Sequence, residues 1–94
     1  MKVVEVSNTA DITGINQLIV CDSSGPIIIS LKRSALGLSY GYIIKNIGAG
    51  IVTVTPVLND LIDGAATKDV VQYEAIHIMD YKTNHWIIIS DNHV

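Results

Sequence analysis

Short runs of isoleucine and valine, interrupted by glycine, proline, asparagine, aspartate or serine, dominate this sequence. Sixteen Ile and ten Val together occupy 26 of the 94 positions. β-branched side chains favour extended backbone, and the interrupting residues are those that form turns. Turns recur about every 8–12 residues, a spacing typical of β-sandwiches and barrels rather than of alternating strands and helices. The sequence therefore predicts an all-β domain.

Eight segments have the composition of strands, and only Lys32–Leu38 is suited to a helical turn. The predicted strands are Lys2–Val6, Gln17–Cys21, Ile27–Leu31, Tyr42–Ile47, Ile51–Thr55, Val70–Gln72, Ala75–Tyr81 and Trp86–Ser90. We expect about 8 short strands in an antiparallel β-sandwich or a jelly-roll-like arrangement.

Three pairs of strands are predicted to form hairpins. The clearest joins Tyr42–Ile47 to Ile51–Pro56 through Gly48-Ala49-Gly50, because a three-residue loop with a glycine free to take the left-handed conformation is a favoured connection. This pairing puts Ile43 on the more polar face of the hairpin. Two other pairs have an aspartate suited to a turn at the end of their first strand: Leu18–Asp22 with Pro26–Leu31, and Ile76–Asp80 with His85–Ser90.

The composition excludes several classes of protein. Hydrophobic residues are 49% of the chain and charged residues only 16%, against about 25% in ordinary soluble domains. This composition excludes intrinsic disorder, and no apolar run approaches the 18 or so residues of a transmembrane helix. The net charge of −3 and the scattered basic residues argue against nucleic-acid binding. The segment Met1–Val6 is too short and too early charged for a signal peptide, which predicts the cytoplasm as the place of synthesis.

Two triple-isoleucine segments predict contact between copies of the chain. In a strand, Ile27 and Ile29 point to one face and Ile28 to the other, so both faces are apolar. One face can pack into the core, and a second copy is the simplest cover for the other. The predicted oligomer interface is Ile27, Ile28, Ile29, Ile87, Ile88 and Ile89.

Residues of catalytic or metal-binding type are present, but their spacing favours structural roles. His77, His85 and His93 lack the spacing of metal ligands within one chain, although copies of one histidine meeting on a symmetry axis remain an alternative. Asp63-Gly64 is interpreted as a turn, and Cys21 as a small buried hydrophobe. We therefore assign no catalytic, metal-binding or cofactor-binding residue.

The aromatic residues leave two interpretations open. Tyr40, Tyr42, Tyr73, Tyr81 and Trp86 are suited either to a sugar-stacking platform or to interfaces with the ring buried and the hydroxyl in water. The platform would require the indole ring to be exposed.

From Asp11 onward, the order of several short motifs resembles a module of tailed-bacteriophage virion proteins, including head fibres and tail appendages. The motifs are Leu18–Asp22, Pro26–Leu31, Tyr42–Gly50, Val52–Pro56, Leu61–Ala66, Gln72–Glu74 and Asn84–Ile88. The resemblance implies a non-enzymatic, β-rich structural module that is commonly trimeric and located in the virion. It implies a single domain over 11–94, preceded at 1–10 by an N-terminal strand or anchoring arm.

The resemblance also implies roles for particular residues and for the whole chain. Asp63 and Gly64 look like fold-determining turn positions, and Trp86, after Asn84, looks like the anchor of the last hairpin. Gly48 and Gly50 are predicted as fold-determining turn positions from the hairpin loop itself. The expected function is that of a capsid decoration or head-fibre component, made in the host cytoplasm, whose partners are copies of itself and other virion proteins such as a capsid or anchoring protein. The alternative is a receptor- or glycan-binding tip of a tail appendage. No cofactor, nucleic acid or membrane is expected.

Overall fold

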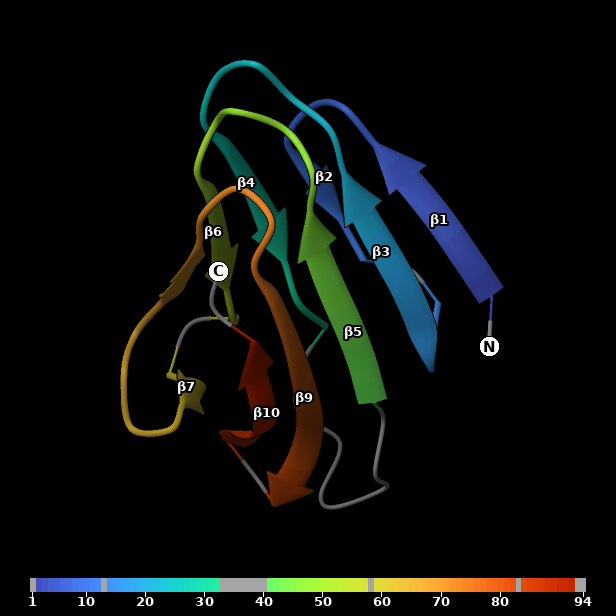
Figure 1. Cartoon of the computed structure of the whole chain (residues 1–94). Coiled ribbons are helices and arrows are strands. Elements are labelled where there is room, and N and C mark those ends of the chain that lie inside the picture. The colour runs from blue at the N-terminus through green and yellow to red at the C-terminus, as the bar shows by residue number, and fades with distance from the viewer. Residues whose placement is uncertain (1, 13, 33–40, 58, 83, 93–94) are drawn as a thin grey trace.

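The protein is an all-β structure of two mixed sheets (Figure 1). The computed structural model describes residues 2–12, 14–32, 41–57, 59–82 and 84–92, and no helix occurs among them. The strands are β1 (Lys2–Val6), β2 (Ala10–Asp11), β3 (Gln17–Cys21), β4 (Ile27–Ser30), β5 (Gly41–Asn46), β6 (Val52–Thr55), β7 (Leu61–Ile62), β8 (Lys68–Val70), β9 (Ala75–Lys82) and β10 (His85–Asn92). The predicted helical turn at Lys32–Leu38 falls largely on residues outside the described ranges.

The first six strands alternate between the two sheets. Strands β1, β3 and β5 run parallel in a six-stranded sheet of order β1-β3-β5-β9-β10-β7. Strands β2, β4 and β6 run parallel in a four-stranded sheet of order β2-β4-β6-β8. Each odd strand and the even strand after it therefore form one coil, and three such coils stack on one another (Figure 1).

Two of the three predicted hairpins are wrong. Strands β3 and β4 lie in different sheets, and so do β5 and β6, so neither pair shares a ladder. The turn after β5 bonds instead to the turn of the preceding coil: Ile47 N donates to Cys21 O at 2.8 Å, and Gly50 N donates to Ser23 O at 2.9 Å. A short glycine-rich loop suits both a hairpin and a crossing between sheets, which is why its composition misled the prediction.

Gly48 and Gly50 are needed for close approach rather than for a left-handed backbone. A Cβ on Gly48 would collide with the backbone of Ser23, and one on Gly50 would collide with the backbone of Gly25. Among the described glycines only Gly64 has a positive φ, of 81°. The stacked turns therefore exclude side chains at these two positions.

The second half of the chain adds antiparallel strands. Strand β8 pairs with β6, and β9 pairs with both β5 and β10. The predicted hairpin of Ile76–Asp80 with His85–Ser90 is confirmed, with bulges at His85/Trp86 and Ile88/Ser90. The all-antiparallel pairing predicted from sequence is wrong, because the coiled first half requires parallel neighbours. The two-residue strands β2 and β7 were missed because they are too short to show a period.

The space between the sheets is filled by side chains from both. Ile19, Ile44 and Ile78 from the six-stranded sheet and Val54 from the other are each at most 2% exposed. They belong to one cluster of buried hydrophobic side chains, to which both sheets contribute. Alternate residues of each strand therefore meet in a single core.

A fully buried asparagine holds the crossing between the sheets. The Asn46 amide nitrogen donates to Gly50 O at 2.8 Å and to Val70 O at 2.9 Å, while its side-chain oxygen accepts from Gly48 N at 3.0 Å. This one side chain satisfies three backbone groups that the turn withdraws from water. It ties the end of β5 to the turn and to β8.

Replacing this side chain should destabilise the fold strongly. Asn46→Ala leaves three backbone groups buried without partners, and we expect the free energy of unfolding to fall by about 2–4 kcal/mol. Chemical denaturation at several denaturant concentrations measures this change. The control Asn8→Ala alters an exposed asparagine and should change stability by less than about 0.5 kcal/mol. Equal effects of the two substitutions would contradict a structural role for the Asn46 network.

Candidate interaction surface

The outer face of the six-stranded sheet is lined by aliphatic side chains. On β3, Gln17, Ile19 and Cys21 are buried, so the intervening Leu18 and Val20 point outward. The register places Leu18 between Val3 of β1 and Ile43 of β5. Farther along the sheet, Met79 of β9 lies opposite Ile87 of β10. We call this set the outer aliphatic face: Val3, Leu18, Val20, Ile43, Met79 and Ile87.

Most of this face is half-buried although none of the described strands covers it. Val3 at the edge is 57% exposed, whereas the other five residues fall in the intermediate range. Side chains on adjacent strands of a sheet lie close enough to shield one another, so neighbouring aliphatic side chains such as Leu18 and Ile43 form shared apolar surface rather than protruding separately. Contiguous apolar surface of this kind is typical of interaction sites.

Charged and titratable groups lie beside and between these aliphatic side chains. Glu5 and Lys45 lie on either side of Val20 in the same row, and His77 lies beside Ile43 in the next. The Lys45 ammonium donates to Tyr73 O at 2.7 Å. The face therefore has a carboxylate toward its β1 edge and an ammonium toward its centre.

The six isoleucines predicted as an interface are divided between core and surface. Ile27 and Ile29 are 5% and 1% exposed and belong to the intrachain core, whereas Ile28 is 46% exposed on the four-stranded sheet. Ile88 packs against the core, and Ile89 is 51% exposed next to the bulge. Of the six, only Ile87 lies on the outer aliphatic face.

The surroundings of Ile28 are polar. Its register neighbour Thr53 donates a side-chain hydrogen bond to Asp69 Oδ1 at 2.9 Å, and its own backbone N–H donates to the Thr9 hydroxyl at 3.0 Å. Ile28 is therefore an isolated aliphatic side chain on a hydroxyl-rich surface. The structure does not bring the two triple-isoleucine segments together into one patch.

Sequence reasoning missed the main members of the outer aliphatic face. The sequence predicted Ile43 on the polar face of a hairpin with Ile51–Pro56. Because β5 pairs with β3 and not with β6, Ile43 instead lies beside Leu18. The sequence did contain a sign of this face: in Leu18–Val20 and Tyr42–Ile44, the residues that point to either side of the strand are all uncharged. Such runs are typical of strands whose two faces are both covered.

The exposed aromatic platform that was one of the two interpretations does not include Trp86 or Tyr42, because both are buried. Trp86 is 1% exposed and Tyr42 is fully buried, with ring centroids 5.9 Å apart at an interplanar angle of 42°. Tyr73 and Tyr81 are half exposed, and Tyr40 lies outside the described residues. The indole packs in the core and is not available to stack on a sugar.

The turn residues expected at 63 and 64 form a tight turn after β7. Asp63 and Gly64 have φ angles of 48° and 81°, and Ile62 and Ala65 exchange two backbone hydrogen bonds of 2.8 Å across them. The Asp63 carboxylate also accepts from Ile88 N at 3.2 Å. The turn is thereby attached to β10, two residues beyond the buried Trp86.

The remaining candidate groups do not converge on a reactive site. Within the described ranges, no group of three or more His, Cys, Asp or Glu side chains has a metal-binding arrangement. His77 lies on the outer face of β9 and His85 begins β10, while His93 is outside those ranges. No described helix is long and apolar enough to cross a membrane.

Comparison with known proteins finds no family model, curated protein or solved structure that matches this chain.

Cys21 is fully buried, and its burial gives a pH-dependent contribution to stability. Desolvation raises the pKa of the thiol from 9.0 to about 11. As pH rises above 9, the unfolded chain loses this proton first, so the stability from the neutral thiol is complete below pH 9 and is lost by about pH 11. We expect a loss of about 2–3 kcal/mol over that range, measured by denaturation.

The variant Cys21→Ala serves as the reference for this titration. It removes the thiol but leaves every other titrating group, so the difference in unfolding free energy between the two proteins should shrink as pH rises from 9 to 11. A difference that stays constant with pH would show that the thiol titrates alike in the folded and unfolded states.

Proposed function

We propose that this protein is a non-enzymatic structural component of a tailed-bacteriophage virion, a capsid decoration or head-fibre protein that acts as a homo-oligomer. The sequence motifs support the virion assignment and the trimeric state. The single observation that carries the proposal of assembly is the outer aliphatic face.

The physical reason for assembly is the cost of leaving this face in water. Burial of apolar surface stabilises by about 25 cal/mol per Å², and a stable interface buries about 800 Å² on each partner. A domain this small buries only about 60–65% of its unfolded surface by itself. Contact between copies would bury this face, which no layer of the described residues covers.

The charges along the face favour a ring of copies. Glu5 lies toward the β1 edge and Lys45 toward the sheet centre. In a head-to-tail contact, the β1 edge of one copy lies against the sheet centre of the next. This contact brings Glu5 of one copy near Lys45 of the other. Head-to-tail contacts that close produce rings, of which a trimer is one.

On a capsid, such a ring would bridge neighbouring subunits of the lattice and stabilise them. The described chain needs no catalytic group for this role, since the stabilisation comes from binding several neighbours at once. The anchoring partner is another virion protein.

The oligomer should be sensitive to a charge on the outer aliphatic face. Leu18→Lys puts an ammonium into the proposed contact, and we expect each contact to weaken by about 2 kcal/mol or more, roughly thirtyfold. Sedimentation velocity at micromolar concentration would show a shift from oligomer to monomer. Circular dichroism checks that the variant remains folded.

The matched control is Ile28→Lys, which introduces the same group on the four-stranded sheet. It should leave the sedimentation coefficient unchanged. A wild-type protein that sediments as a monodisperse monomer, or an Ile28→Lys variant that dissociates while Leu18→Lys does not, would contradict this interface.

The virion role is tested by composition. Quantitative mass spectrometry of purified particles of the encoding phage should detect the chain at a fixed copy number that is a multiple of three. Absence from the particles would contradict the proposal. Specific binding on a glycan array, lost in Tyr73→Ala or Tyr81→Ala, would instead favour the receptor-binding alternative.

A further inference from the structure

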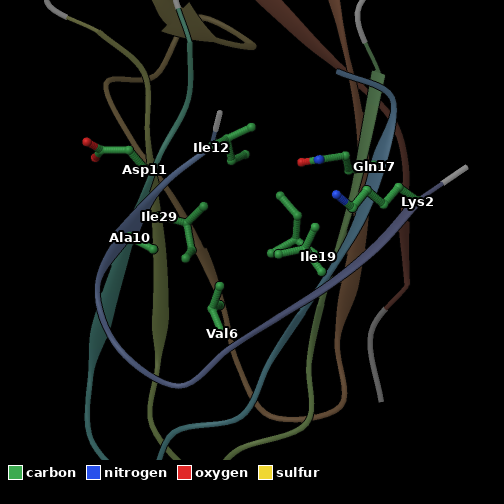
Figure 2. A pocket seen from close by; sticks show the side chains of 9 residues that line it. Lys2, Val6, Ala10, Asp11, Ile12, Gln17, Ile19 and Ile29 are labelled. Carbon is green, nitrogen blue, oxygen red and sulfur yellow. The ribbon is translucent and has the colours of Figure 1, made fainter. Parts of the chain in front are cut away.

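A cavity of about 190 Å³ lies between the two sheets at their first strands (Figure 2). Strand β2, at this end of the four-stranded sheet, has only two residues, whereas β4 and β6 have four each. The walls of the cavity are apolar side chains from β1 to β4: Val4, Val6, Ala10, Ile12, Ile19 and Ile29.

The amide of a largely buried glutamine faces this cavity. Gln17 is 9% exposed, and its side chain lines the cavity. Figure 2 shows its amide directed toward the central space. A Cβ on Gly14 would collide with this amide, so the glycine leaves room for it. The amide offers both a hydrogen-bond donor and an acceptor to a polar group bound in the cavity.

A cation lies beside the same amide. Lys2 also lines the cavity, and in Figure 2 its ammonium points toward the central space from the side of Gln17. The one carboxylate of the lining, that of Asp11, points away from the central space. The cavity thus combines apolar walls with an ammonium and an amide on one side. An anion with an aliphatic tail matches this arrangement.

We propose that the cavity binds a short, unbranched aliphatic carboxylate. One carboxylate oxygen accepts from the Lys2 ammonium and the other from the Gln17 amide, and such charge-assisted bonds are stronger than neutral ones. The methylene chain lies against Ile19 and Ile29. This binding site is independent of the proposed virion role, because it uses the space between the sheets and not the outer aliphatic face.

The volume limits the length of the ligand. An apolar cavity of about 150 Å³ accommodates benzene, so one of 190 Å³ accommodates a chain of about six carbons. Each buried methylene should improve affinity roughly fourfold until the cavity is full. Hexanoate should therefore bind about 16-fold more tightly than butanoate, and octanoate should gain little more.

The test is an NMR titration of the full chain with butanoate, hexanoate, octanoate and 1-hexanol. We expect saturable shifts at the backbone amides of Val4, Val6, Ile19 and Ile29, with hexanol at least fivefold weaker than hexanoate. Lys2→Met should reduce hexanoate affinity at least fivefold and leave hexanol affinity unchanged. The control Lys82→Met removes a lysine that does not line the cavity and should leave both affinities unchanged.

Gln17→Leu removes the amide at similar volume and should also weaken hexanoate at least fivefold. If this variant does not fold, the exposed Lys2 still decides the outcome. The proposal is overturned if hexanoate gives no saturable shift at tens of millimolar, if chain length has no effect, or if Lys2→Met binds hexanoate as well as the wild type does. A crystal soaked in hexanoate that shows only water on the Gln17 amide overturns it as well.

Discussion

The stacked turns that carry the chain from one sheet to the other are the constraint on which the rest of the structure depends. Asn46 lies fully buried at this crossing and bonds to three backbone groups of the turn and of β8. Gly48 and Gly50 lack side chains where the preceding turn lies against them. Together they place β5 and β6 in opposite sheets, and this alternation gives the molecule its two layers.

The two layers explain both proposed surfaces. Because consecutive strands alternate between sheets, the first three strands of the larger sheet are parallel neighbours whose outward side chains come together in rows. Those rows form the outer aliphatic face. On the inner side of the same strands, the cavity is lined by residues of β1 to β4. The proposed assembly and the proposed ligand binding would therefore use opposite sides of the same strands.

The composition of the strands was readable from the sequence, but their partners were not. Seven of the predicted segments overlap observed strands closely, and the eighth, Val70–Gln72, meets β8 only at Val70. The last hairpin was also recognised, because a polar turn separates two long β-branched segments. The hairpin predicted at Gly48-Ala49-Gly50 failed, since the hydrogen bonds that decide between a hairpin and a crossing come from Ser23 and Cys21 of another coil. The burial of Trp86 likewise depends on Tyr42 and the sheets around it.

The sequence by itself determined that this chain forms strands, that its core is built from β-branched side chains, and that its apolar residues exceed what one core requires. Those properties follow from the backbone preference of each residue type and from the composition of the chain, neither of which depends on distant contacts. The tertiary structure alone decided which strands are neighbours, and hence that Leu18, Val20 and Ile43 share a face while Ile28 lies apart from it. Strand pairing depends on hydrogen bonds between segments that are distant in the sequence. Alternation of side chains along a strand is the same in a hairpin and in a coil, so it does not distinguish between them.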